Sequence, residues 1–373
     1  MAADLYRKLA GHMDNLPGGF PPTATDVEIR ILKRLFRPEE AELALYLTLI
    51  PEAPGVVARR AKISKEEAAR RLEGMAKKGL LFRVEEMPGK PAYMAAQFVI
   101  GIWEFHVNDL APGLVKDMEE YIPYLKDTAW KIPQLRTIPV GKSIHNELKV
   151  LTYEKAEELV ANHDRFSISP CICRRERKLV GEGCDKPEEN CLTFGIAADF
   201  AVRNGFGRAS DKQEILEVLQ QANEVGLVLQ PGNSREVNYI CCCCGCCCAA
   251  LRTINRFPKP AAWVSSPFLI EAQPDTCEGC GVCQERCQMK ALSLVDGRVA
   301  LDADRCIGCG LCVSTCPTES LILKRKPENV QTKISRNMMT SVYALGRARG
   351  KLGLGELLKM QVKSKVDRLL APR

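Results

Sequence analysis

Cysteines in a repeated spacing are the residues of this 373-residue chain best suited to chemistry. The segments CEGCGVCQERC and CIGCGLCVSTCP share the spacing C-x2-C-x2-C-x3-C. Three thiolates separated by two residues each can converge on three irons of one cube, and the glycines between them give the backbone room to wrap it. The fourth cysteine, three residues further on, then points elsewhere. The chain has 19 cysteines in all, an odd number that together with the clustered spacing favours metal binding over a disulfide scaffold.

The segment from about Gln273 to Lys326 resembles the dicluster domain of bacterial ferredoxins, in which the fourth cysteine of each motif binds the cluster of the other motif. The resemblance implies two 4Fe-4S clusters. Their expected ligands are Cys277, Cys280, Cys283 and Cys316 for the first, and Cys306, Cys309, Cys312 and Cys287 for the second. The chain departs from the family pattern at Gln288, where the proline seen at Pro317 is usual. Since proline is not a ligand, we expect the clusters to be retained with a changed local geometry.

Zinc is the alternative metal for these eight cysteines. Zinc takes four ligands in tetrahedral geometry, usually from paired C-x2-C knuckles, and two interleaved quartets fit that pattern badly. Between the motifs, ALSLVDGRVAL alternates apolar and polar residues on both sides of Asp296-Gly297, which predicts a β-hairpin.

A second cysteine-rich region lies upstream of the two motifs. The tract CCCCGCCC has seven cysteines between Cys241 and Cys248, and SISPCICRRERKLVGEGCDKPEENC offers four more. Neighbouring residues on a strand point to opposite faces, so the tract can serve two sites, and Gly245 can supply a turn between them. We expect one or two additional iron-sulfur clusters here. The candidate ligands are Cys171, Cys173, Cys184, Cys191, Cys241, Cys243, Cys244, Cys246 and Cys247.

Two other interpretations of this region remain open. Some of the thiols can be small buried apolar side chains, because free cysteine is common in protein cores. A noncubane or double-cubane catalytic cluster would also need many cysteines. The block from Ser167 to about Leu251, with a helix expected in DKQEILEVLQQANEVGLV, resembles poorly characterised iron-sulfur proteins of anaerobic microbes. That resemblance implies anaerobic electron transfer and names no reaction.

The N-terminal third has a different character. Apolar spacing predicts helices in DVEIRILKRLF, PEEAELALYLTLI and PGVVARRA, and a fourth in SKEEAARRLEGMAKKGLL that begins with a Ser64…Glu67 capping box. Two strands are expected around Pro88-Gly89. This order resembles a winged-helix domain, a fold usual in microbial regulators. Acidic Glu66 and Glu73 interrupt the cations of the fourth helix, which weighs against DNA binding and favours a protein-docking or structural role.

The C-terminal tail is basic and has an amphipathic pattern. ELLKMQVKSKVDRLL places Leu358, Val362, Val366 and Leu369 on one helical face. Such a helix can fold onto its own domain, dock an acidic redox partner or rest on an anionic membrane, and its lack of Trp and Phe makes the membrane the weakest of the three. We expect no transmembrane segment, because the longest nearly apolar run, YMAAQFVIGIW, is too short. The N-terminus lacks an apolar stretch of signal-peptide length, which predicts a cytoplasmic protein.

These patterns together predict an α+β multidomain protein. The expected domains are an N-terminal arm (1–22), a winged-helix-like domain (23–100), a connector (101–165), a cysteine-rich iron-sulfur domain of α+β type (166–265), a ferredoxin-like dicluster domain (266–326) and a basic helical tail (327–373). The predicted function is the transfer of single electrons to or from a redox partner, a flavoprotein or an anaerobic oxidoreductase complex. One alternative is a redox-sensing winged-helix transcriptional regulator. Another is a reductase subunit with a catalytic iron-sulfur cluster, so whether the chain is an enzyme stays open.

Overall fold

The computed structural model describes residues 2–371, so Met1 of the expected arm and residues 372–373 of the expected tail lie outside it. The described chain divides into two compact units. Unit 1 comprises the residues up to 132, residues 199–207 and the residues from 342 onward. Unit 2 comprises residues 133–198 and 208–341, and it contains all 19 cysteines. The expected connector is therefore divided at residue 132, and the expected tail at residue 341.

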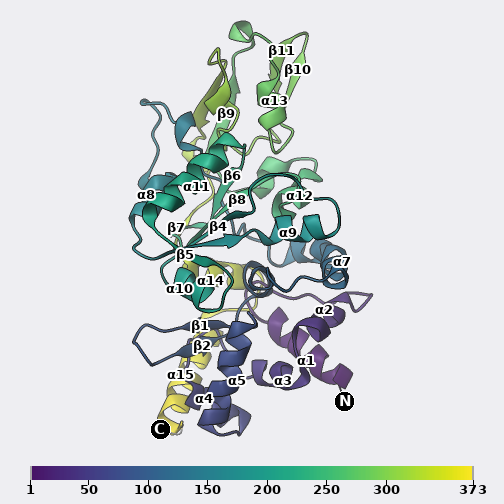
Figure 1. Ribbon diagram of the computed structural model, residues 1–373, viewed down its shortest axis with the longest axis vertical. Helices are drawn as coiled ribbons and strands as arrows, with labels where there is room; N and C mark the ends of the chain where they lie inside the picture. Colours follow the sequence, from purple (N-terminus) through teal and green to yellow (C-terminus); the bar gives the residue numbers. More distant parts are fainter. Residues whose placement is uncertain (1, 372–373) are drawn as a thin grey trace. The chain divides into compact units, whose positions relative to one another are not determined.

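Unit 1 consists of helices and one β-hairpin (Figure 1). Its first elements are α1 (Ala2–Asp14), α2 (Val27–Leu35), α3 (Pro38–Ala44), α4 (Pro54–Ala61), α5 (Lys65–Lys77), β1 (Phe82–Val84) and β2 (Ala92–Met94). Ser64 caps α5 as predicted, because its Oγ accepts a 3.1 Å hydrogen bond from the amide of Glu67. The antiparallel hairpin around Pro88-Gly89 is also present. The helix expected across 38–50 is shorter, since α3 ends at Ala44.

The remaining part of unit 1 adds α6 (Trp103–Phe105), α7 (Pro112–Tyr121), the end of α10 (Ile196–Arg203), most of α14 (Met338–Ala348) and α15 (Leu354–Leu370). Aromatic packing explains why residues 199–207 belong here. The ring of Phe200 lies 4.5 Å from that of Phe82 and 4.9 Å from that of Phe105, while Phe206 stacks on Phe105 at 5.6 Å. Such ring pairs add to the stabilisation that burial alone provides.

Helix α15 contacts α4 through its polar side. Asp367 is buried and pairs with Arg59 and Arg60, while Ser364 donates a 2.7 Å hydrogen bond to Glu52. The four apolar residues that the sequence aligned on one face of this helix are exposed, namely Leu358, Val362, Val366 and Leu369. No helix among residues 2–371 combines the length and apolar character needed to cross a membrane.

Unit 2 is organised around a five-stranded antiparallel sheet with the strand order β5-β3-β4-β8-β6 (Figure 1). The strands are β3 (Phe166–Pro170), β4 (Glu189–Phe194), β5 (Arg208–Ser210), β6 (Val228–Pro231) and β8 (Tyr239–Cys243). Helix α11 (Lys212–Glu224), which contacts three of these strands and α8 (Ala156–Ala161), is the helix predicted from DKQEILEVLQQANEVGLV. Asp211 is the N-cap of this helix, because its side-chain oxygen accepts a 2.9 Å hydrogen bond from the amide of Glu214.

The two faces of this sheet differ in chemistry because side chains alternate along each strand. Leu192 on β4 stands opposite Ile240 on β8, and Leu229 on β6 stands opposite Cys242, all within the hydrophobic core. The residues between them therefore project from the other face. They include Cys191 on β4 and its partner Cys241 on β8.

The dicluster segment has its own small strands. β9 (Phe268–Ala272) pairs with β12 (Leu321–Arg325), and β10 (Leu292–Val295) pairs with β11 (Arg298–Leu301). The second pair is the predicted hairpin, since Asp296 and Gly297 both adopt positive φ, as a type I′ turn requires. Unit 2 also contains α9 (Ile172–Leu179), β7 (Ser234–Glu236), α12 (Ala249–Asn255), α13 (Val282–Arg286) and β13 (Ser335–Asn337).

Candidate metal centres

The first cysteine quartet of the dicluster segment surrounds one pocket. Its thiol-bearing lining residues are Cys277, Cys280, Cys283 and Cys316, the set expected to share a cluster. Gly279 and Gly281 have φ of 72° and 77°, which lets the backbone bend around the pocket. The amide of Gly279 donates a 3.3 Å hydrogen bond to the Cys277 thiol. Four thiols on one cavity, with a backbone amide directed at sulfur, fit a 4Fe-4S cluster.

The second quartet is more deeply buried. Burial raises the pKa of Cys312, and repulsion from Cys309, Cys306 and Cys287 adds to the effect. Burial also raises the pKa of Cys309 to about 12, again with repulsion from Cys287 and Cys306. The structure thus brings Cys287 of the first motif to the cysteines of the second. A bound metal cluster would offset the cost of placing several thiolates together, so these residues fit the second cluster.

Gln288 occupies the position where the family pattern usually has proline, and the structure gives it a contact with the tract. Its side-chain oxygen accepts a 2.7 Å hydrogen bond from the amide of Gly245. Its carbonyl accepts a 3.0 Å hydrogen bond from Asn255. The turn in the middle of the tract therefore rests on the residue that follows Cys287.

Six of the remaining cysteines form a connected set, which we call the six-thiol group. Its members are Cys171, Cys173, Cys191, Cys241, Cys243 and Cys248. The Cys173 thiol contacts Cys171 and Cys248, Cys248 contacts Cys243, and Cys241 contacts Cys243 and Cys191. Strand alternation explains three members, because Cys191, Cys241 and Cys243 share one face of the sheet, and the other three lie at the starts of α9 and α12.

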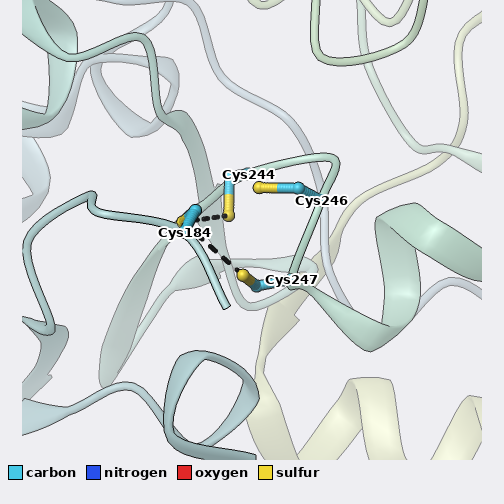
Figure 2. A group of neighbouring side chains, drawn as sticks. All are labelled: Cys184, Cys244, Cys246 and Cys247. Atoms are coloured by element: carbon cyan, nitrogen blue, oxygen red, sulfur yellow. Dashed lines mark hydrogen bonds between the residues drawn. The ribbon is translucent and has the colours of Figure 1, made fainter. Parts of the chain in front are cut away.

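Four further cysteines converge separately, and we call them the four-thiol group (Figure 2). They are Cys184, Cys244, Cys246 and Cys247, whose sulfurs all lie within 4.8 Å of one another. Cys184 comes from the loop between α9 and β4, and the other three come from the turn that follows β8. The Cys184 sulfur is 3.9 Å from that of Cys244 and 3.5 Å from that of Cys247. A hydrogen bond with Cys247 lowers the pKa of Cys244 to about 4, and the positive charge of Arg174 contributes.

Arg174 is a fully buried cation between the two groups. Burial disfavours its charge, yet attraction to the thiolates of Cys171, Cys244 and Cys243 raises the guanidinium pKa above its ordinary value. One nitrogen donates a 3.2 Å hydrogen bond to the carbonyl of Cys242. The sequence did not single out this residue, since the run RRERK does not distinguish a buried arginine from an exposed one.

The tract thus divides in a way that the sequence predicted only in part. The sequence indicates that the tract can serve two sites. In the structure, three of its seven cysteines belong to the six-thiol group and three to the four-thiol group. Cys248, which was not among the predicted ligands, joins the six-thiol group at the start of α12. Cys242, which was also left out, faces the hydrophobic core, where burial raises its pKa. Which of these thiols bind metal stays a prediction.

Comparison with known proteins bears on the dicluster segment. Residues 276–320 match the family model of the 4Fe-4S dicluster domain. The chain carries a 4Fe-4S dicluster domain. The matched range includes all eight cysteines of the two motifs and covers a minor part of the chain. No curated protein and no solved structure matched the chain.

Proposed function

We propose that this protein transfers single electrons through iron-sulfur clusters. Two 4Fe-4S clusters occupy the dicluster domain, and a third cluster occupies the six-thiol group. The match of residues 276–320 to the 4Fe-4S dicluster domain is the observation that carries the proposal. The expected partner is a redox protein, a flavoprotein or an oxidoreductase complex, that supplies or accepts the electrons.

The contact between Gly245 and Gln288 supports a connected path. Gln288 directly follows Cys287, an expected ligand of the second cluster, and Gly245 lies within the tract that contributes to both thiol groups. The core of unit 2 is also continuous across this contact, because Cys287 packs against the cores of both the sheet and the dicluster segment. Electrons can therefore pass between a cluster in the tract and the dicluster domain over a short stretch of packed protein.

The test is a count of iron and acid-labile sulfide per chain in protein purified without oxygen, followed by a reductive titration monitored by low-temperature EPR. Three cubane-sized clusters would give about twelve irons with matching sulfide, and reversible one-electron steps. About eight irons would remove the third cluster from the proposal and leave the dicluster pair. Absence of reversible reduction would contradict electron transfer itself.

A matched pair of variants tests the six-thiol group. Cys243 and Cys242 are neighbours on β8 and both are buried, but they lie on opposite faces of the sheet. Cys243→Ala should reduce the iron and sulfide content, whereas Cys242→Ala should leave both unchanged. Equal metal contents in the two variants would show that Cys243 is not required for a cluster in this group.

A second candidate function is a reductase subunit that carries a catalytic cluster. The observation in its favour is the number of thiols, since the six-thiol group offers two more than a cubane uses. A cluster with an open coordination site should change its EPR spectrum when a small thiol is added to the reduced protein. An unchanged spectrum would favour the carrier.

A further inference from the structure

We propose that the four-thiol group binds a single tetrahedral divalent ion, Zn²⁺ or Fe²⁺, and that this ion clamps the Cys184 loop to the turn of the tract. From the sequence we expected these four cysteines to be among the ligands of an additional iron-sulfur cluster, and the single ion is an alternative to that prediction. The inference does not depend on electron transfer by the dicluster domain.

The sulfur separations carry the argument. A zinc-thiolate bond is about 2.3 Å long, so neighbouring sulfurs of a tetrahedral site lie about 3.8 Å apart. The observed separations of 3.9 Å and 3.5 Å from Cys184 match that value, and the four sulfurs stay within 4.8 Å of one another. A cubane places four irons and four sulfides between its thiolates, which requires a wider set.

Other cysteines of the same protein provide an internal comparison. Within residues 2–371, the four-thiol group is the one set of three or more potential ligands with such close spacing. The cysteines around the dicluster pocket, in the segment that matches a 4Fe-4S domain, are spread more widely. In the six-thiol group neighbouring thiols contact one another in pairs, but no three of its sulfurs all lie this close together. The four-thiol group therefore differs in geometry from both expected types of cluster site.

Charge supplies a second, independent observation. Four thiolates around a divalent ion leave a net charge of about −2, which needs a counter-charge when the site is partly buried. Arg174 is fully buried beside Cys184 and Cys244, and its Nε and Nη1 atoms have no hydrogen-bond partner among the described residues. A buried guanidinium with free donors is costly without an anion, and a metal-tetrathiolate site provides one.

The position of the group explains what the ion would do. Residues 180–188 connect α9 to β4 without a helix or strand of their own, and Cys184 is their contribution to the group. The other three ligands flank Gly245, whose amide is bonded to Gln288. An ion bound to all four would fix this loop to the turn and hold the turn against the dicluster domain.

The first experiment compares two exposed cysteines, Cys246 of the four-thiol group and Cys280 of the dicluster pocket. Zinc, iron and acid-labile sulfide are measured per chain in full-length C246S, C280S and the parent, all purified without oxygen. We expect C246S to lose about one zinc or one iron with no loss of sulfide and no change in the cubane EPR signals. C280S should lower the iron content and alter those signals. The element lost in C246S distinguishes zinc from iron.

A loss of several irons with matching sulfide in C246S would overturn the proposal. A parent protein that contains no zinc, and no iron beyond the amount matched by acid-labile sulfide, would also overturn it. If C246S fails to fold, spectroscopy of the parent decides. Zinc-edge X-ray absorption should show four sulfurs at about 2.3 Å and no metal neighbour, or Mössbauer spectra should contain a lone high-spin Fe²⁺ component. Metal-metal scattering at the zinc edge, or iron present only in clusters, would contradict a single-ion site.

Discussion

Gly245 joins the cysteine tract to the dicluster domain because it has no side chain. A Cβ atom at this position would lie 2.2 Å from the carbonyl oxygen of Gln288, a distance that no real contact allows. The sequence suggested Gly245 as the turn within the tract, and it identified Gln288 as a departure from the family pattern. It gave no sign that the two residues meet, since they are 43 positions apart.

We expect Gly245→Ala to destabilise unit 2. The added methyl group must push the turn away from Gln288 and weaken the 2.7 Å hydrogen bond between them. Overpacking of this kind costs about 1–3 kcal/mol, measurable by denaturant unfolding under anaerobic conditions. Gly74→Ala is the control, because a Cβ on Gly74 of α5 would meet no atom within 4 Å, so this substitution should be neutral or slightly stabilising. Equal stability of G245A and the parent would mean that the turn does not rest on Gln288.

Arg174 should tune any metal site in the tract through its charge. Arg174→Gln removes a buried cation next to the thiolates of both groups, so the negatively charged centres lose their counter-charge. Loss of such a supporting group typically lowers metal affinity about 10- to 100-fold, and it should shift the reduction potential of the proposed third cluster to more negative values. The readouts are metal retention against a chelator and the EPR-monitored titration.

Arg175→Gln provides the matched control for that experiment. Arg175 is the next residue of α9, is partly exposed and pairs with Glu188. Its substitution should leave both the metal content and the potential unchanged. If R174Q behaves like R175Q, the charge of Arg174 does not act on the metal sites.

At the scale of elements, strand and helix periodicity account for much of what the sequence predicted. Alternation on β8 directs Cys242 into the hydrophobic core and leaves Cys241 and Cys243 on the other face, whereas the four-thiol group takes its tract cysteines from the turn beyond the strand. The capped helix α5, the hairpins and the helix α11 follow from local signals within a few residues. The membership of Cys248 and the burial of Arg174 depend on pairing between distant strands and loops, which local patterns do not specify.

Helix α15 shows a further limit of periodicity. Its apolar stripe left open whether the apolar face packs on the helix's own domain, and in the structure the buried residues of the helix are Ser364 and Asp367. Arg60 explains why the polar side of the helix is buried, because this arginine is nearly fully buried and Asp367 gives it a second carboxylate beside Glu52. Tertiary ion pairing therefore decides which side of this helix packs on α4.

We predict that Asp367→Ala destabilises unit 1 by about 3–5 kcal/mol, because it leaves the buried guanidinium of Arg60 short of one of its two carboxylate partners. Thermal unfolding followed by circular dichroism measures the effect. Lys359→Ala, an exposed position on the same helix, should change little. The iron content and EPR spectrum should be unaffected by either substitution, since all the cysteines belong to unit 2. A D367A protein as stable as the parent would show that α15 is not held by this network.

At the scale of the whole molecule, the candidate metal ligands lie in one unit and most of the helices in the other. The dicluster domain and both thiol groups lie in unit 2, whereas unit 1 contains no cysteine among its described residues. The winged-helix fold expected for the N-terminal third stays a prediction, whereas the dicluster domain could be predicted from sequence because it has a dense ligand motif. The division of the expected connector and tail between the units could not, because it depends on packing such as that of Phe200 on Phe82.

A redox-sensing regulator would bind DNA through the winged-helix-like part of unit 1, which lies within residues 1–132. Residues 1–132 carry 19 lysines and arginines against 19 aspartates and glutamates, so this part of the chain has no excess positive charge. On α5 and just after it, Arg71 pairs with Glu67 and Lys78 pairs with Glu40, which removes two of the cations available for phosphate contacts. Binding to duplex DNA depends on such contacts and weakens steeply with salt.

We therefore predict no measurable binding of the full chain to random duplex DNA at about 0.15 M salt, in either redox state, by fluorescence anisotropy. Weak binding at low salt should come from the basic helix α15 and disappear in Lys359→Glu/Lys363→Glu, while the α5 variant Arg70→Glu/Lys77→Glu should behave like the parent. Tight binding that the α5 substitutions abolish would reverse this conclusion. It would then assign unit 1 to a DNA-binding regulator and the clusters of unit 2 to sensing.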